Sequence, residues 1–171
     1  RRARRSGRPL ERRTHALRGP VEVGVHKRRA EVGKGNAFER DKLIRFHHCD
    51  PAGIVFYPQY FILFHELVED WFNHGLQHNY AELVYRQRLG LPMVRVECDF
   101  LSPSKIGEML TLSLGVRRIG RSSLGLAVEG VAGGVPRVRA ALTVVLADVD
   151  GLRSVAFPAE LRAGIERYLT G

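Results

Sequence analysis

Hydrophobic side chains recur at three- and four-residue steps after Pro58, and this spacing predicts one long helix that ends near Gly75. Pro58 suits the first helical position, where the N–H group that proline lacks would have no partner, and glycine is typical of a helix end. Because Ile62 and Leu63 lie partly off the stripe, we expect the helix to be buried on more than one side. The stripe consists of Tyr60, Phe61, Phe64, Leu67, Val68, Trp71 and Phe72.

After residue 93 the hydrophobic period changes to two, which predicts strands with one buried face. Four such strands are expected, over 94–100, 110–117, 124–129 and 138–146, with turns between them that contain Pro or Gly. The pattern also predicts a short strand over 43–47 and helices over 80–88 and 158–169. This order indicates an α+β fold in which one antiparallel sheet wraps around one apolar helix.

The charge of the chain is concentrated at its N-terminal end. The 171 residues include 27 Lys+Arg and 18 Asp+Glu, for a net charge of +9; residues 1–40 contain 13 and 4 of them, and residues 41–171 contain 14 and 14. We therefore predict one neutral domain over 38–171, preceded by a basic extension over 1–37 that cannot bury enough apolar surface to fold. A neutral domain does not favour binding to nucleic-acid phosphates.

The extension allows three functions besides that of a solvated tail, namely a transit peptide, a nucleic-acid-binding arm or a membrane-surface tether. We favour the solvated tail and expect no nucleic-acid or membrane partner, since no apolar run approaches the ~20 residues that cross a bilayer. The chain has no apolar segment of a secretory signal, so we expect a cytoplasmic protein. Its two cysteines, Cys49 and Cys98, are too few for a disulfide scaffold or a four-thiolate zinc site.

Candidate chemistry is concentrated between Phe46 and Phe61. Asp50 lies in a predicted tight turn just before the long helix, whose N-terminus offers unpaired N–H groups and a partial positive charge. Such donors suit a carbonyl oxygen that becomes negative during acyl transfer, and a nearby carboxylate can act as nucleophile or as base for water. The alternative, which spacing alone favours, is that Asp50 only caps the turn through its own backbone.

The residues CDPAGIVFYP at 49–58 resemble the signature of the 4-hydroxybenzoyl-CoA thioesterases, a family of hotdog-fold acyl-CoA thioesterases, and the similarity extends over 41–160. The resemblance implies the hotdog fold, a sheet wrapped around a central helix, which agrees with the hydrophobic pattern. It also implies a cytosolic enzyme that dimerises by joining sheets, often into tetramers, with active sites at the subunit interface. Neither a metal nor an organic cofactor is implied.

Position by position, the resemblance makes Asp50 the catalytic carboxylate and the backbone N–H of Tyr57 the donor to the thioester carbonyl. It places Arg121 and Ser123 in the loop where family members hold basic residues against the phosphates of CoA, with Arg118 as a further candidate. The alternative for the two arginines is solvated charge at a strand end.

The central helix departs from the family pattern at one position. The aromatic-specific members carry a carboxylate about two turns into this helix, where the present chain has His65 with Glu66 beside it. The resemblance therefore does not fix a 4-hydroxybenzoyl substrate, and Glu66 is a second candidate for the catalytic carboxylate. Neighbouring helix residues point about 100° apart, so we do not expect His65 and Glu66 to share one role in substrate binding. The alternative for both is a polar patch at a dimer interface.

We predict an acyl-CoA thioesterase that hydrolyses an aromatic or short-chain acyl-CoA to a free acid and CoA. Phe56, Tyr60 and Phe64 are candidates for the acyl pocket, although core packing is the favoured interpretation. A dehydratase or hydratase of the same fold is a competing hypothesis, but Asp50 has no histidine at the five-residue spacing that the hydratase branch uses. A non-catalytic acyl-CoA-binding module and a nucleic-acid binder that acts through residues 1–40 are two more competing hypotheses.

Several residues outside this proposal have ligand or nucleophile chemistry but unfavourable spacing. Residues 47–50, His-His-Cys-Asp, would face opposite sides of a strand and could not converge on one metal ion. His74 and His78 are four residues apart, but Gly75 argues that the helix ends between them. Cys49 as a nucleophile would need a nearby histidine base held by a third group, and a buried thiol is the favoured interpretation.

Overall fold

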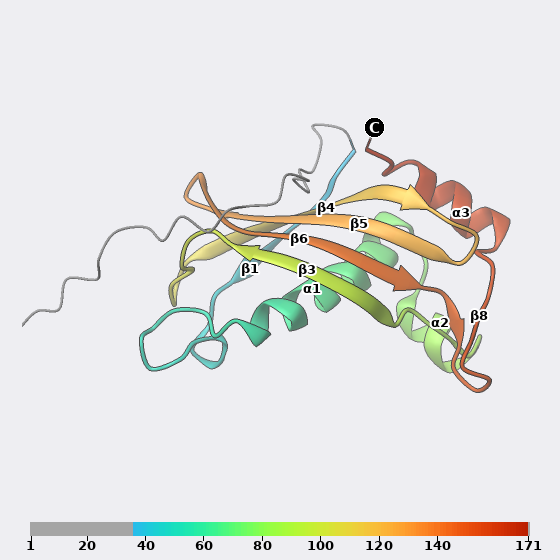
Figure 1. Cartoon of the computed structure of the whole chain (residues 1–171), viewed down its shortest axis with the longest axis horizontal. Coiled ribbons are helices and arrows are strands. Elements are labelled where there is room, and N and C mark those ends of the chain that lie inside the picture. The colour runs from blue at the N-terminus through green and yellow to red at the C-terminus, as the bar shows by residue number, and fades with distance from the viewer. Residues whose placement is uncertain (1–35, 171) are drawn as a thin grey trace, which may run out of the picture.

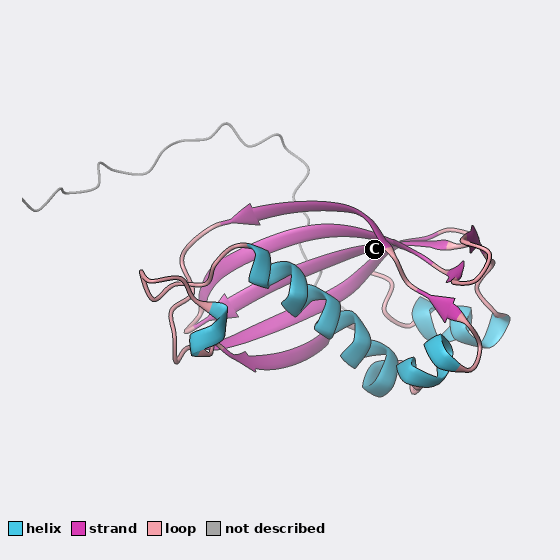
Figure 2. Cartoon of the chain, turned by 90° about the horizontal axis from the view of Figure 1, so that it is seen from below, coloured by secondary structure: helices cyan, strands magenta, loops and turns pink. Residues whose placement is uncertain are grey.

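The computed structural model describes residues 36–170, so all but the last two positions of the predicted basic extension lie outside the described residues. Within that range no helix is both long enough and apolar enough to span a membrane. The described chain forms one main sheet, a long helix against it, and shorter helices at one end (Figures 1 and 2).

The main sheet has five strands, and each neighbouring pair is antiparallel. Every second residue of the central strands is buried, as in Leu110, Leu112 and Leu114, which are each 0% exposed. The period of two therefore predicted the strands and the buried face of the central ones correctly. The buried face predicted for the strand over 94–100 is wrong, because Val94, Val96 and Phe100 are 60%, 37% and 49% exposed on this edge strand. In sheet order the strands are β1 (Phe38–Leu43), β4 (Met109–Ile119), β5 (Ser123–Ala132), β6 (Val135–Val145) and β3 (Met93–Phe100).

The helix α1 (Pro58–Asp70) lies across the face around which the sheet curves (Figure 2). It continues as one π-helical segment, η2 (Trp71–Gly75), so the helical rod begins and ends at the predicted residues. Phe64 and Tyr60 are buried in the core, as the favoured interpretation held, but it is wrong for Phe56, which is 48% exposed. The expectation that the helix is buried on more than one side is wrong for the single chain, because Ile62 is 52% exposed on its outer face.

The segment before α1 differs from the sequence prediction. The strand predicted over 43–47 is wrong, because β1 ends at Leu43 and a 3₁₀ turn, η1 (Phe46–His48), follows it. The physical reason is local: Nδ1 of His48 accepts a hydrogen bond from the N–H of Arg45 at 3.0 Å, which closes the turn.

The remaining elements lie around one end of α1 (Figure 1). The helix α2 is shorter than predicted, and the closing helix α3 begins as predicted, directly after Pro158. A second sheet of two-residue strands was not predicted, because so short a run shows no hydrophobic period. These elements are α2 (Tyr80–Tyr85), β2 (Leu89–Gly90), β7 (Ala147–Asp148), β8 (Arg153–Ser154) and α3 (Ala159–Glu166).

Two regions that matter for function lie at opposite ends of the strands of the main sheet. At one end, Ile44 and Gly107 are hydrogen-bonded beside the start of β4, next to the segment that leads into α1. At the other end, the β4–β5 turn contacts the segment before α3, where the Phe157 N–H donates to the Arg121 carbonyl at 3.0 Å. Since β4 has 11 residues, the two ends are about 33 Å apart at ~3.3 Å per residue.

Candidate active site

Asp50 begins a tight turn that its own sequence explains. The N–H of Gly53 donates to the Asp50 carbonyl at 2.9 Å, and Gly53 has φ +74°, a conformation that glycine adopts without strain. Asp, Pro and Gly occupy the first, second and fourth positions that a type I turn favours. The Asp50 Oδ1 accepts the Ala52 N–H at 2.8 Å, so the capping contact expected from the alternative interpretation is present. The second carboxylate oxygen accepts no hydrogen bond within residues 36–170.

The turn is the tip of a small hairpin that leads directly into α1. Asp50 N–H donates to the Ile54 carbonyl at 3.0 Å, and Phe56 N–H donates to the His48 carbonyl at 2.9 Å. The residue after Phe56 is Tyr57, the N-cap of α1. Tyr57 lies three residues beyond the partner of Asp50, so the two backbones are about 10 Å apart along an extended strand.

A buried contact fastens this hairpin to the start of α1. Val55 N–H donates to the Ser104 carbonyl at 2.9 Å, and Ile106 N–H donates to the Gly53 carbonyl at 3.1 Å. The Tyr60 hydroxyl, in the first turn of α1, donates to Oγ of Ser104 at 2.8 Å, and both side chains are at most 3% exposed. Sequence reasoning missed Ser104, because nothing local links two residues that are 44 positions apart.

The N-terminus of α1 presents a free donor. Among the described residues, no acceptor receives a hydrogen bond from the Tyr57 N–H, and Pro58, the next residue, has no N–H. Free N–H groups at a helix N-terminus attract negative charge. The geometry is therefore suited to an oxygen that becomes negative.

Aromatic rings surround this helix terminus. Tyr57, Phe56 and Phe100 are about half exposed, and the Tyr57 ring lies 6.2 Å from that of Phe100 and 6.4 Å from that of Phe61 in edge-to-face arrangements. Edge-to-face contacts at these distances are typical of stable aromatic clusters. The surface beside the Tyr57 N–H is thus apolar and aromatic.

His65 and Glu66 project from α1 in different directions. The His65 ring is 6.2 Å from that of Tyr80 of α2. Glu66 instead accepts a hydrogen bond from Lys42 of β1 at 3.1 Å, and Lys42 also contacts Asp70 at 3.0 Å. The two neighbours therefore do not converge, and Glu66 is held in an ion-pair cluster.

Arg118, Arg121 and Ser123 lie at the β4–β5 turn, at the opposite end of the sheet from Asp50. Arg118 and Arg121 are exposed, and neither forms an ion pair within residues 36–170. The Ser123 carbonyl accepts the Gly120 N–H at 2.8 Å. One protomer alone does not bring these residues to Asp50.

Neither cysteine is poised to act as a nucleophile, and the His-His-Cys-Asp run at 47–50 does not converge on one metal ion. Burial, and then the charge of Asp50, raise the pKa of the Cys49 thiol, which disfavours the thiolate that a nucleophile needs. Burial raises the pKa of Cys98 to about 12. No three His, Cys, Asp or Glu side chains among the described residues are placed to hold one metal ion.

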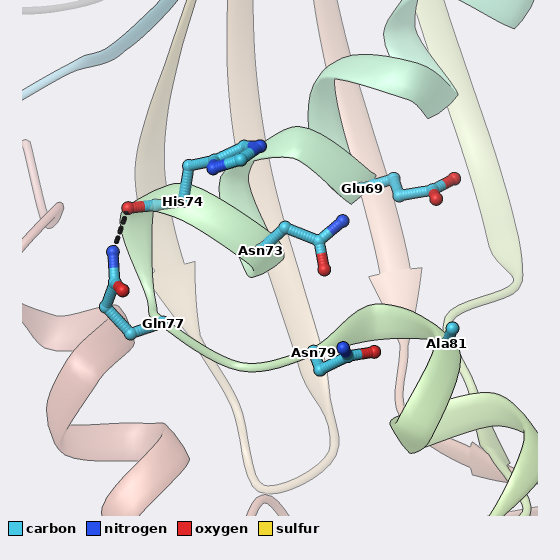
Figure 3. Close-up of a pocket in the computed structure, with 6 residues that line it drawn as sticks. All are labelled: Glu69, Asn73, His74, Gln77, Asn79 and Ala81. Atoms are coloured by element: carbon cyan, nitrogen blue, oxygen red, sulfur yellow. Dashed lines mark hydrogen bonds between the residues drawn. The ribbon is translucent and has the colours of Figure 1, made fainter.

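A polar pocket of about 510 Å³ lies at the far end of α1 (Figure 3). Its amides are engaged in local structure: Asn73 Oδ1 accepts the Tyr80 N–H at 2.8 Å, and Gln77 Nε2 donates to the His74 carbonyl at 2.6 Å. His78 does not line it, and neither does any of the predicted site residues. The lining residues are Glu69, Asn73, His74, Gln77, Asn79 and Ala81.

The curved antiparallel sheet around a central helix, with a carboxylate turn at the helix N-terminus, defines a protein of the hotdog fold. The chain belongs to the thioesterase-like superfamily, whose family model matches residues 44–165.

Of three similar proteins, two are named as a CoA hydrolase and a thioesterase-superfamily protein, and the third shares the fold. A 1,4-dihydroxy-2-naphthoyl-CoA hydrolase from Nostoc punctiforme is 24% identical over 130 residues, which are 76% of this chain and 87% of that protein. The crystal structure of a thioesterase-superfamily protein from Jannaschia sp. CCS1 is 29% identical, with a TM-score of 0.73, and the match covers 79% of this chain and 94% of that one. A Staphylococcus aureus protein solved in complex with CoA is 19% identical, with a TM-score of 0.69 and coverage of 78% and 84%.

Proposed function

We propose that this protein hydrolyses an acyl-CoA thioester to a carboxylic acid and free CoA. The observation that carries the proposal is the hairpin that joins Asp50 to the unpaired N–H of Tyr57. The hairpin carries a carboxylate oxygen without a hydrogen bond at its tip, and it ends at a free helix-terminal donor beside aromatic rings. Together they would supply the two functions that thioester hydrolysis requires, a base or nucleophile and an oxyanion donor.

In the general-base route, the free oxygen of Asp50 takes a proton from water while the water oxygen forms a bond to the thioester carbon. The carbonyl oxygen becomes negative and accepts a hydrogen bond from the Tyr57 N–H. The C–S bond then breaks, and the thiolate of CoA takes up the proton. In the nucleophilic route, Asp50 itself attacks the carbon, and the C–S bond breaks to release the thiolate of CoA. Water then hydrolyses the resulting anhydride to the free acid and the Asp50 carboxylate. Both routes use the same two groups.

We infer that the complete site requires a second copy of the chain, joined at the edge strand β3. Phe100, at one end of β3, lies against Tyr57, whereas Met93, at the other end, pairs with Val144 near the β4–β5 turn. In an antiparallel β3–β3 pairing about a two-fold axis, the Asp50 end of one protomer meets the Arg121 end of its partner. The two groups that lie apart in one protomer would then serve one substrate.

The acyl group that best suits this site is aromatic. The exposed rings of Phe56, Tyr57 and Phe100 favour edge-to-face contact with a flat ring. The relatives support this choice, since one is named a 1,4-dihydroxy-2-naphthoyl-CoA hydrolase and a structural neighbour is named a gentisyl-coenzyme A thioesterase. His65 lies on α1, the helix that would face the aromatic ring of the acyl group. Glu66 is instead ion-paired with Lys42.

The test is thiol release from a panel of aromatic, short-chain and long-chain acyl-CoAs by the wild type and Asp50→Asn. Asparagine keeps an oxygen for the Ala52 N–H but supplies no base, so kcat is expected to fall by about 10²–10⁴-fold while the melting temperature stays unchanged. Asp148→Asn is the matched control, because Asp148 makes the same turn contact, with the Asp150 N–H at 3.0 Å, and is not one of the proposed site residues. Equal turnover by wild type and Asp50→Asn would refute the mechanism, and binding without turnover by the wild type would favour a non-catalytic acyl-CoA-binding module.

A further inference from the structure

The β4–β5 turn that carries Arg121 is fixed by three hydrogen bonds to its successive carbonyl groups. The Gly120 carbonyl accepts a bond from Nη1 of Arg162 at 2.9 Å, the Arg121 carbonyl accepts the Phe157 N–H at 3.0 Å, and the Ser122 carbonyl accepts the Leu146 N–H at 2.8 Å. All three donors lie in the C-terminal segment that follows β6. The conformation of the turn therefore depends on how that segment is seated.

Arg162 is the one side chain among these three donors. It lies on α3, whose apolar residues Leu161 and Ile165 are at most 3% exposed and hold the helix against the core. Nε of Arg162 donates to Glu166, one turn further along α3, at 3.1 Å, which fixes the guanidinium toward the Gly120 carbonyl. A Cβ at Gly120 would lie 2.6 Å from Oγ of Ser123, so a larger residue there would require the Ser123 side chain to shift.

The same turn has an excess of positive charge. Arg117, Arg118 and Arg121 are exposed, and within residues 36–170 none of them is paired with a carboxylate. Guanidinium groups bind phosphate through paired, directional hydrogen bonds, so their position matters as much as their charge. Because hydrogen bonds hold the carbonyl groups of Gly120, Arg121 and Ser122, the backbone of Arg121 stays in one position.

We propose that Arg162 is a positioning residue for the binding of CoA: it holds the Gly120–Ser123 turn so that Arg121 meets the phosphates of the nucleotide. This inference rests on the proposed function. Arg162 acts through the Gly120 carbonyl and does not reach the thioester. Its loss therefore weakens the recognition of the nucleotide and leaves the chemistry at Asp50 in place.

The test compares two thioesters of the same aromatic acid, benzoyl-CoA and benzoyl-N-acetylcysteamine, which lacks the nucleotide and all phosphates. Arg162→Met is expected to raise KM for benzoyl-CoA about fivefold, the loss of roughly one hydrogen bond, with kcat unchanged. The kcat/KM for the short thioester is expected to stay at the wild-type value. Arg167→Met is the matched control, since Arg167 lies at the end of the same helix and, among the described residues, its Nε donates only to the Gly164 carbonyl.

A double-mutant cycle separates positioning from simple charge. In the Arg121→Met background, Arg162→Met is expected to cause no further rise in KM, because there is no Arg121 left to position. Independent, additive effects of the two substitutions would overturn the proposal, and so would an equal loss of kcat/KM for both thioesters. If Arg162→Met lowers the melting temperature, Arg162→Gln, whose shorter side chain does not reach the Gly120 carbonyl, takes its place. A wild type that cleaves neither thioester would instead refute the proposed function itself.

Discussion

The hydroxyl of Tyr60 donates a hydrogen bond to Oγ of Ser104 at 2.8 Å, and both side chains are buried beneath the Asp50 hairpin. Ser104 also accepts the Val55 N–H through its carbonyl, so one residue is bonded to both the hairpin and the first turn of α1. Burial raises the pKa of Tyr60 against the opposing effect of the Ser104 hydrogen bond, and the hydroxyl stays a neutral donor. This contact joins the hairpin that carries Asp50 to the first turn of α1.

Tyr60→Phe is expected to destabilise the protein by about 1–3 kcal/mol, because it leaves the Ser104 hydroxyl buried without its donor. The free energy of unfolding in urea measures this loss. Tyr60→Phe/Ser104→Ala is expected to lose less than the sum of the two single variants, since the double variant leaves no unpaired polar group. Strict additivity would show that the two hydroxyls contribute independently.

The stability of the hairpin is expected to decrease on acidification because of His48. Burial, and then the charge of His47, lower the pKa of His48 in the folded protein, and the neutral ring accepts the Arg45 N–H at Nδ1. The unfolded chain binds its proton near pH ~6.5 and the folded chain only at lower pH. The free energy of unfolding therefore keeps its full value above about pH 6.5 and decreases as the pH falls below that value.

His48→Asn tests this dependence, because an asparagine oxygen can replace Nδ1 as an acceptor and does not titrate. Urea unfolding between about pH 8 and pH 5 is expected to show a smaller loss of stability for His48→Asn than for the wild type. His47→Asn, at the exposed neighbour, is the control and is expected to retain most of the pH dependence. A His48→Asn variant with the wild-type pH profile would contradict the assignment.

Local chemistry was enough to predict some features and not others. The Asp-Pro-Ala-Gly turn and the start of α1 at Pro58 follow from residues next to each other, and the structure places both where they were predicted. The contacts of Ser104 with Tyr60 and of Arg162 with Gly120 join residues more than 40 positions apart, so no local pattern indicates them. Likewise, the period of a helix shows that the side chains of His65 and Glu66 diverge. Only the tertiary structure shows that Glu66 forms an ion pair with Lys42.

Glu66→Gln is expected to leave thioester hydrolysis intact, because Glu66 is held by Lys42 as part of a structural cluster. Burial alone would lower the pKa of Lys42, but hydrogen bonds to Asp70 and Glu66 raise it, so Lys42 stays charged. Loss of one partly exposed ion pair costs at most about 1 kcal/mol, and Lys42→Met is expected to cost more because it leaves two carboxylates without their partner. Urea unfolding measures the stability of both variants, and kcat measures their thioester hydrolysis. A large fall in kcat for Glu66→Gln would make Glu66 the candidate catalytic carboxylate again.

The pairing of two protomers through β3 is expected to fail in Val94→Lys. Val94 is 60% exposed on this edge strand, and lysine on a strand edge opposes pairing with another strand. Sedimentation is expected to show a shift from dimer to monomer and a loss of acyl-CoA hydrolysis. Val135→Lys is the matched control, since Val135 is an exposed valine (47%) of β6, which is not an edge strand, and the variant is expected to stay dimeric. A Val94→Lys variant that stays dimeric would place the interface elsewhere.

Subunit mixing tests whether the two protomers share one site. Asp50→Asn and Arg121→Met are each expected to hydrolyse acyl-CoA poorly at low substrate concentration. In a mixed dimer, however, Asp50 of one protomer and Arg121 of its partner would form one intact site and leave the second site doubly altered. After random exchange of subunits, about a quarter of all sites are intact, so mixing the two variants is expected to restore activity to roughly that fraction of the wild type. Activity in the mixture that never exceeds the mean of the two separate variants would show that Asp50 and Arg121 do not meet across the interface.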